Sequence, residues 1–257
     1  MEFSPLDVVP PASRTADKLP FSQVLGSVGY LATRTMPWLL FAFGMLATIA
    51  RPSAAVPGAP TAAARVALAR VLRYLRGNQD LGLTYTKQDE FRLDAWVDAS
   101  HGREVHQTAN GLCKSRSGGF IKASGASVCA LSASQATTAE LYALVLLVRI
   151  LLAMRRLTTF VIGRSLATSV VYCDNMSVLL QLRKRDLTSR SRHIRVHIGF
   201  VVDAVESGEI RLEHVRSAVN PANTLTAAED VARFVRSIDA MSGRPPEGDY
   251  DGLPKSN

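Results

Sequence analysis

The sequence predicts an α/β fold in which helices pack on the faces of a mixed sheet. This prediction rests on residues 87–241, where strand-like and helical stretches alternate. One strand, TSVVYC at 168–173, is short and continuously apolar, as expected for a strand buried on both faces. The order of elements is strand, strand, strand, helix, strand, helix, helix, strand, helix, and the sequence contains no internal repeat.

The strands are recognised by apolar and β-branched residues between turn signals, and the helices by apolar residues at helical spacing. GGFIKASG and SVCALSAS are separated by a short glycine-containing turn, which predicts a hairpin. The predicted strands lie at 92–100, 118–125, 127–134, 168–173 and 209–217, with a further strand-like stretch at 81–86, and the predicted helices lie at 138–156, 176–185, 193–206 and 227–241.

The first 86 residues have a different texture, with apolar helices joined by proline-rich segments. The strongest helical pattern, Ala62 to Arg76, is rich in Ala, Leu and Arg and ends at Gly77, a residue type that favours a helix C-cap. Two further helices are predicted at 21–33 and 37–50. We therefore expect four units, namely a flexible lead-in at 1–20, helices at 21–86, a sheet domain at 87–241 and a disordered tail at 242–257.

The composition excludes several classes of protein. The chain of 257 residues is 47% hydrophobic and 20% charged, which is not the composition of a disordered chain. Its three cysteines, Cys113, Cys129 and Cys173, form no C-x-x-C pair, which indicates a reducing compartment and no zinc site. The net charge of +8 favours a polyanionic partner such as nucleic acid.

Neither membrane insertion nor secretion is indicated by the sequence. The most hydrophobic stretch, Trp38 to Ala50, is shorter than the roughly 20 residues that a spanning helix needs. The stretch from Leu141 to Met154 is interrupted by Arg149. We therefore expect each of these two stretches to be a buried helix and not a membrane span. The N-terminus is acidic and proline-rich and lacks the features of a signal peptide. We expect an intracellular protein, cytoplasmic or nuclear, with no membrane partner.

Three carboxylates stand where ligands gather in an α/β fold. Asp98 lies near the end of the first strand of the sheet domain, Glu140 begins the long helix, and Asp174 directly follows the short buried strand. Strand ends and helix starts are the positions at which open sheets bind ligands. If the three side chains converge, their oxygens would bind hard divalent cations, and two Mg²⁺ ions held in this way can hydrolyse a phosphodiester.

Each of these carboxylates, taken alone, also has an ordinary structural interpretation. Asp98 could be a strand-end or turn residue, Glu140 could favour the positive end of its helix, and Asp174 could cap the next helix. Structural carboxylates outnumber functional ones, so the prediction depends on the joint placement of all three.

An ordered set of motifs resembles the C-terminal part of the Pol polyprotein of copia-type LTR retrotransposons, that is, the tail of the reverse transcriptase followed by its RNase H domain. The upstream part of the match is FSQVLGSVGYLATRT at 21–35 and RVLRYLRGNQDLGLTY at 70–85. WVDAS, CKSRSGG, TTAELYAL, VYCDNMS, SRHIRVH and GEIRLEHV then follow in the order of the family. Any single motif is a weak signal, and the ordered set over most of residues 21–230 is a specific one.

The resemblance implies an RNase H-like mixed sheet flanked by helices, preceded by a small helical segment from the reverse transcriptase thumb or connection. It also implies that Asp98, Glu140 and Asp174 are catalytic ligands of Mg²⁺ or Mn²⁺. The implied reaction is cleavage of the RNA strand of an RNA–DNA hybrid. The fourth carboxylate of the family falls in NPANTLTA at 220–227, where Asn223 occupies the Asp position. An Asn oxygen can ligate a cation but brings no negative charge, so we expect one metal site to be weaker.

Several polar and basic residues are predicted to contact the nucleic acid. Asn175 could hydrogen-bond a 2′-hydroxyl or cap a helix, and Ser115 and Ser117 could approach the minor groove or belong to a plain hairpin. The basic window from Arg183 to Arg195 would neutralise backbone phosphates or form a solvated face. His193 could contact a phosphate or be a partly buried histidine. The predicted contacts in the window are Arg190, Arg192, His193 and Arg195.

Two functions are compatible with these observations. The first is a retrotransposon-derived RNase H-type nuclease, impaired by Asn223, whose partners are an RNA–DNA hybrid and the rest of a reverse transcriptase. A virus-like particle is a compatible setting, and the sequence contains no polymerase-type Tyr-x-Asp-Asp motif. The alternative is a catalytically inactive nucleic-acid-binding remnant of a retrotransposon polyprotein.

Overall fold

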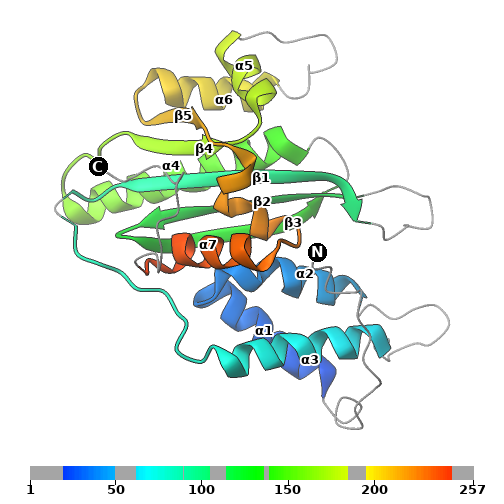
Figure 1. Cartoon of the computed structure of the whole chain (residues 1–257). Helices are drawn as coiled ribbons and strands as arrows, with labels where there is room; N and C mark the ends of the chain where they lie inside the picture. Colours follow the sequence, from blue (N-terminus) through cyan, green and yellow to red (C-terminus); the bar gives the residue numbers. More distant parts are fainter. Residues whose placement is uncertain are drawn as a thin grey trace.

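A five-stranded mixed sheet forms the centre of the fold (Figure 1). Its strand order is β3-β2-β1-β4-β5, in which β2 is antiparallel to both β1 and β3, and β4 is parallel to both β1 and β5. The strands are β1 (Leu93–Glu104), β2 (Lys114–Ala123), β3 (Ala126–Gln135), β4 (Ser169–Cys173) and β5 (Ile210–His214). The computed structural model describes residues 20–49, 62–88, 90–104, 114–135, 139–184 and 195–244.

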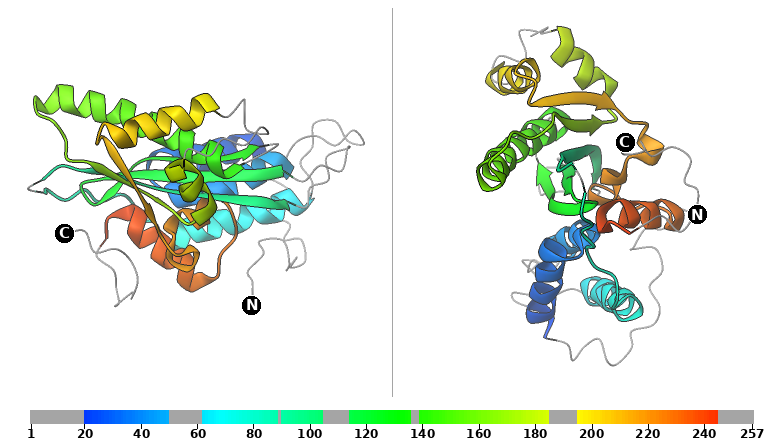
Figure 2. Two further views of the ribbon diagram at one scale, coloured as in Figure 1. Left: turned by 90° about the horizontal axis from the view of Figure 1, so that it is seen from above. Right: turned by 90° about the vertical axis from the view of Figure 1, so that its left-hand side faces the viewer.

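Helices cover both faces of this sheet, as the side view in Figure 2 shows. The helices α4 (Ala139–Ile162), α5 (Met176–Lys184) and α6 (Arg195–Glu206) pack on one face. The helix α7 (Val231–Ser242) lies on the other face and follows two short 3₁₀ helices, η4 (Ser217–Val219) and η5 (Pro221–Leu225). This arrangement confirms the predicted mixed sheet flanked by helices.

The N-terminal helices lie on the same side of the sheet as α7. They are α1 (Phe21–Arg34), the 3₁₀ helix η2 (Pro37–Leu39), α2 (Leu40–Ile49) and α3 (Ala62–Gly77). In the part of the chain that the structure describes, no helix is long and apolar enough to cross a membrane.

The face toward α4 is held by an apolar cluster. Ala95 and Val97 of β1 point into it because alternate residues of a strand share a face. On α4, Leu147 and Leu151 are fully buried one helical turn apart. Continuing the alternation along β1 places the side chain of Asp98 on the opposite face.

That opposite face carries three stacked aromatic rings, which we call the aromatic row: Phe120, Trp96 and Tyr172. The ring of Trp96 lies 5.0 Å from that of Phe120 and 4.9 Å from that of Tyr172, so the row crosses β2, β1 and β4. Trp38 of η2 and Ile238 of α7 belong to the same buried cluster. The predicted domain boundary between residues 86 and 87 stays a prediction, and the helices before it share a core with the sheet after it.

The stretch at 81–86, expected to be a strand, is not one. Its backbone is extended, but the N–H of Thr84 donates to the carbonyl oxygen of Ser242 at 2.7 Å and that of Thr86 to the oxygen of Ser124 at 2.9 Å. These partners lie at a helix end and in a hairpin turn. Because no neighbouring strand lies alongside, no ladder of hydrogen bonds forms.

Two predicted helices also have different limits. The helix expected from Ala227 begins at Val231, because the Asp230 side chain accepts a hydrogen bond from the N–H of Arg233 at 2.9 Å and so caps the helix there. The helix expected at 37–50 is divided into η2 and α2. The remaining predicted strands and helices are present, with ends that shift by a few residues.

Candidate active site

Asp98 and Asp174 occupy equivalent positions on neighbouring parallel strands. The last registered pair between β1 and β4 is Val97 with Cys173, and the two aspartates are the next residues. Asp98 continues the side of the sheet on which the aromatic row lies. Asp174 directly follows β4 as predicted, whereas Asp98 lies inside β1, which extends to Glu104. Both residues are partly exposed.

A segment from Asn220 to Thr226, which we call the clasp, is hydrogen-bonded across β1 at Asp98. The side-chain amide of Asn220 donates to the carbonyl oxygen of Val97 at 3.0 Å. The hydroxyl of Thr226 donates to Oδ2 of Asp98. The hydroxyl of Ser100 in turn donates to the carbonyl oxygen of Thr226 at 3.2 Å. The clasp is therefore fixed to the strand on both sides of Asp98.

Gly118 makes room for the clasp on the neighbouring strand. It is the β2 partner of Asp98 in the antiparallel register. A Cβ atom at this position would lie 2.6 Å from Cγ2 of Thr226 and 2.8 Å from Cβ of Leu225. Any larger residue would therefore push the clasp away from β1.

Asn223 lies in η5, within the clasp. Its Nδ2 donates to the carbonyl oxygen of Ser217 at 2.7 Å, which joins η4 to η5. Its Oδ1 is buried and accepts no hydrogen bond from any described residue. A buried acceptor oxygen in that state suits a cation, while the amide nitrogen has a structural partner.

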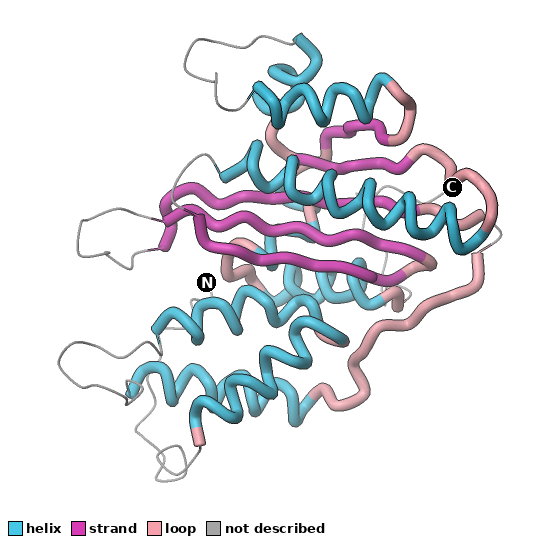
Figure 3. Tube along the Cα trace, turned by 180° about the vertical axis from the view of Figure 1, so that it is seen from behind, coloured by secondary structure: helices cyan, strands magenta, loops and turns pink. Residues whose placement is uncertain are grey.

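Glu140 is the second residue of α4. The first turn of this helix lies toward the end of the sheet at which β4 ends, as Figures 1 and 3 both show. The body of α4 covers the face opposite to the one on which Asp98 lies. The side chain of Glu140 is outside the described residues, so its meeting with Asp98 and Asp174 stays a prediction.

The donor set fits a hard divalent cation in its chemistry. Carboxylate and amide oxygens are the ligands that Mg²⁺ and Mn²⁺ prefer, and Asp98, Asp174 and Asn223 supply them. Among the described residues, no group of three or more His, Cys, Asp or Glu side chains could hold a metal ion. The third carboxylate of the predicted site is that of Glu140.

The structure describes three of the predicted nucleic-acid contacts and assigns a local role to one of them, Asn175. Oδ1 of Asn175 accepts a hydrogen bond from the N–H of Val178 at 3.1 Å, which confirms the helix-cap interpretation. Ser115 and Ser117 of β2 are buried, at 9% and 0% exposure. Their contact with an RNA–DNA hybrid stays a prediction.

The basic window lies mostly beyond the described part of the chain. Arg190, Arg192 and His193 are outside it, and Arg195 is the first residue of α6, with a side chain that is not described. Arg183, at the end of α5, is exposed. Phosphate contact by this window therefore stays a prediction.

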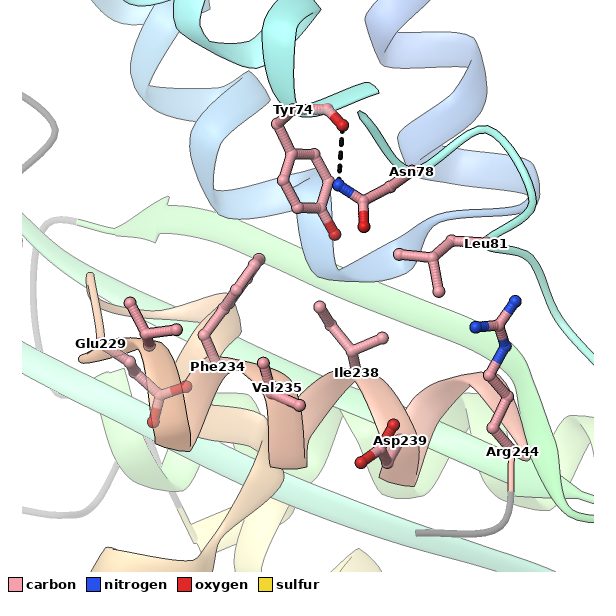
Figure 4. A pocket seen from close by; sticks show the side chains of 10 residues that line it. Tyr74, Asn78, Leu81, Glu229, Phe234, Val235, Ile238, Asp239 and Arg244 are labelled. Carbon is pink, nitrogen blue, oxygen red and sulfur yellow. Dashed lines mark hydrogen bonds between the residues drawn. The ribbon is translucent and has the colours of Figure 1, made fainter. Parts of the chain in front are cut away.

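Glu229 is an acidic residue near the site that the sequence did not single out. Burial raises its pKa to about 7, and the negative charges of Asp230 and Asp98 add to this effect. A hydrogen bond from the Ser237 hydroxyl, at 3.2 Å, opposes it. Glu229 also lines a cavity of about 630 Å³ between α3 and α7, in which Phe234, Ile238 and other apolar side chains face the Tyr74 region (Figure 4).

In the clasp, the sequence predicts only Asn223 as a site residue. Asn220 and Thr226, which make the hydrogen bonds to β1, were not identified as site residues. They are 2% and 3% exposed. The usable signal was the presence of amide and hydroxyl side chains beside Pro221, Ala222 and Leu225, because polar groups buried among apolar ones must find partners.

Two curated relatives are similar to most of this chain. The retrovirus-related Pol polyprotein from transposon RE2 of Arabidopsis thaliana is 27% identical over 239 residues, which is 88% of this chain and 15% of that polyprotein. The corresponding polyprotein from transposon RE1 is 26% identical over 221 residues, 83% of this chain and 14% of that polyprotein. The chain is similar in sequence to copia-type retrotransposon Pol polyproteins. It corresponds to the C-terminal part of such a polyprotein and spans about 15% of the length of these relatives.

Other comparisons find a further relative and two solved structures. The secreted RxLR effector protein 161 of Plasmopara viticola is 31% identical over 121 residues, 47% of this chain and 77% of that protein. Two solved structures of LC11-RNase H1, one of them a crystal structure in complex with an RNA/DNA hybrid, give TM-scores of 0.37 and 0.34 at 13% and 14% identity. They cover 52% of this chain and 94% and 92% of those chains. No family model matches the chain.

Proposed function

We propose that this chain is the RNase H-like nuclease portion of a retrotransposon polyprotein and hydrolyses the RNA strand of an RNA–DNA hybrid with a divalent metal ion. The observation that carries the proposal is the placement of Asp98 and Asp174 next to each other on parallel strands. A carboxylate pair at neighbouring strand positions, with an uncharged oxygen ligand close by, is a donor set for a hard cation. Similarity to retrotransposon Pol polyproteins supports a nucleic-acid substrate.

In this proposal, Asp98, Glu140 and Asp174 hold Mg²⁺ or Mn²⁺, and Asn223 contributes an uncharged oxygen. A divalent ion bound there supplies the Lewis acidity that activates a water molecule and stabilises the leaving oxygen. The chain itself orients the ligands, because the clasp fixes β1 on both sides of Asp98. No Ser or Cys nucleophile is required.

The proposed partners are the RNA–DNA hybrid and the rest of a reverse transcriptase. Six basic residues between Arg183 and Arg195 would neutralise phosphates and make binding weaken as salt rises. The helices at 21–86 would be the tail of the reverse transcriptase, to which the rest of that enzyme connects. Such a complex would act inside the cell, in the cytoplasm or nucleus.

A second function is favoured by one specific contact. The Asn223 amide donates to the Ser217 carbonyl, a role that a carboxylate could not perform. A chain in which the fourth ligand position has been taken over by a structural amide is compatible with a non-catalytic nucleic-acid-binding remnant. In that case the fold and the basic window persist without turnover.

The test is cleavage of a labelled RNA–DNA hybrid with Mg²⁺, comparing the wild type with Asp98→Asn and Asp174→Asn. Asp203→Asn, on the exposed side of α6, is the matched control and should cleave like the wild type. Loss of cleavage in the first two variants alone supports the nuclease. Equal cleavage in all four proteins would reject the site.

Asn223→Asp discriminates the two functions. An impaired nuclease should gain activity because the variant restores a charged ligand. A chain that binds the hybrid without cleaving it, both before and after this change, is the non-catalytic remnant.

A further inference from the structure

We propose that Thr226 is a positioning residue, whose hydroxyl orients the carboxylate of Asp98 for binding a divalent metal ion. This inference rests on the proposed function, because it concerns the same site. It adds a residue that neither the sequence motifs nor the family comparison assigns.

Thr226 is held on several sides by neighbouring residues. Its side chain and backbone are 3% exposed, and its carbonyl oxygen accepts from Ser100 at 3.2 Å. Its N–H donates to the carbonyl oxygen of Asn223 at 3.0 Å. Its methyl group occupies the space that a side chain on Gly118 would need. The hydroxyl therefore approaches Asp98 from a fixed position.

The single hydroxyl hydrogen of Thr226 has two possible acceptors. Oδ2 of Asp98 and the carbonyl oxygen of Asn223, at 3.0 Å, are both within reach. A hydroxyl donates one hydrogen, and an ionised carboxylate is the stronger acceptor. The hydrogen therefore goes to Asp98, where it fixes the plane of the carboxylate group.

The orientation of Asp98 affects how tightly a metal ion binds. Residues that hydrogen-bond a metal-ligating side chain set its orientation, and their loss typically weakens metal affinity or activity about 10- to 100-fold. Thr226 also joins the site to the clasp, since the same residue closes the bridge to Ser100. Orientation of Asp98 by the hydroxyl and attachment of the clasp by the backbone carbonyl are thus linked through one residue.

The experiment compares the full chain with Thr226→Val and Thr226→Ser. Valine keeps the shape and removes the hydroxyl, and serine keeps the hydroxyl. Thr224→Val is the control, because Thr224 lies in the same clasp, is also 3% exposed and makes no hydrogen bond to Asp98. Two readouts are taken against Mg²⁺ concentration, namely hybrid cleavage and the rise in Tm that Mg²⁺ alone produces.

Thr226→Val should require about 10-fold more Mg²⁺ for the half-maximal rise in Tm, while Thr226→Ser and Thr224→Val stay within about threefold of the wild type. A lower Tm in Thr226→Val with an unchanged Mg²⁺ midpoint would mean a purely structural role and would overturn the inference. If the wild type responds to Mg²⁺ but does not cleave the hybrid, only the proposed function fails. If Mg²⁺ does not change the Tm of the wild type, both fail.

Discussion

Asn220 donates its side-chain amide to the carbonyl oxygen of Val97 across 3.0 Å, and so attaches the clasp to β1 at the residue before Asp98. The same side chain accepts from the N–H of Ala222 at 3.1 Å, which starts η5. One buried amide therefore shapes the clasp and places it on the strand. The consequences for stability and for the site can be measured.

Asn220→Ala should destabilise the fold. The change leaves the carbonyl of Val97 and the N–H of Ala222 without their side-chain partner in a buried place, at a cost of about 1–3 kcal/mol. Urea unfolding at neutral pH measures the loss. An unchanged free energy of unfolding would show that the amide contributes nothing to attachment of the clasp.

Gly118→Ala should also destabilise, through overpacking. Its Cβ would meet Thr226 and Leu225 at distances far below contact, which costs about 1–3 kcal/mol and displaces the clasp from Asp98. Gly199→Ala in α6 is the matched control, because a Cβ there has nothing within 4 Å. In that helix, alanine should stabilise by about 0.5–1 kcal/mol. Equal effects of the two substitutions would contradict the close approach at Gly118.

Asn223→Asp should lower stability at pH 7 in the absence of metal. A carboxylate cannot donate to the carbonyl oxygen of Ser217, so a hydrogen bond of about 1 kcal/mol becomes a contact between two acceptors. Added Mg²⁺ should recover part of the loss if position 223 faces the metal site. Thermal unfolding with and without Mg²⁺ separates the two effects, and a variant as stable as the wild type without metal would argue against the structural amide.

Glu229 should make stability depend on pH. Its pKa is raised from 4.5 to about 7 in the folded state, so the folded chain holds the proton more tightly than the unfolded chain. Stability contributed by the neutral carboxyl is therefore present below pH 4.5 and is lost as pH rises from there to about 7.

Glu229→Gln should remove this dependence. The variant should be more stable than the wild type above pH 7 by about 1–2 kcal/mol, a figure reduced to allow for partial exposure of the carboxyl to water. Below pH 4.5 the two proteins should differ little, since both side chains are neutral and both can accept from Ser237. The measurement is urea unfolding at several pH values, and a constant difference across the range would exclude titration of Glu229 as its cause.

The sequence alone determined the class of fold, the order of its elements and the position of Asp174 directly after a buried strand. These properties follow from local patterns, because a short, continuously apolar run such as 168–173 is typical of a strand buried on both faces. The stretch at 81–86 shows the limit of such patterns, since its alternation is real but no strand lies beside it.

The tertiary structure alone decided what surrounds Asp98. Thr226 follows it by 128 residues and Asn220 follows Val97 by 123, so no local pattern could reveal that they are hydrogen-bonded. The raised pKa of Glu229 likewise comes from burial beneath α7 and from the charge of Asp98, which lies far away in sequence. Such contacts depend on how distant segments pack, and packing is a property of the whole fold.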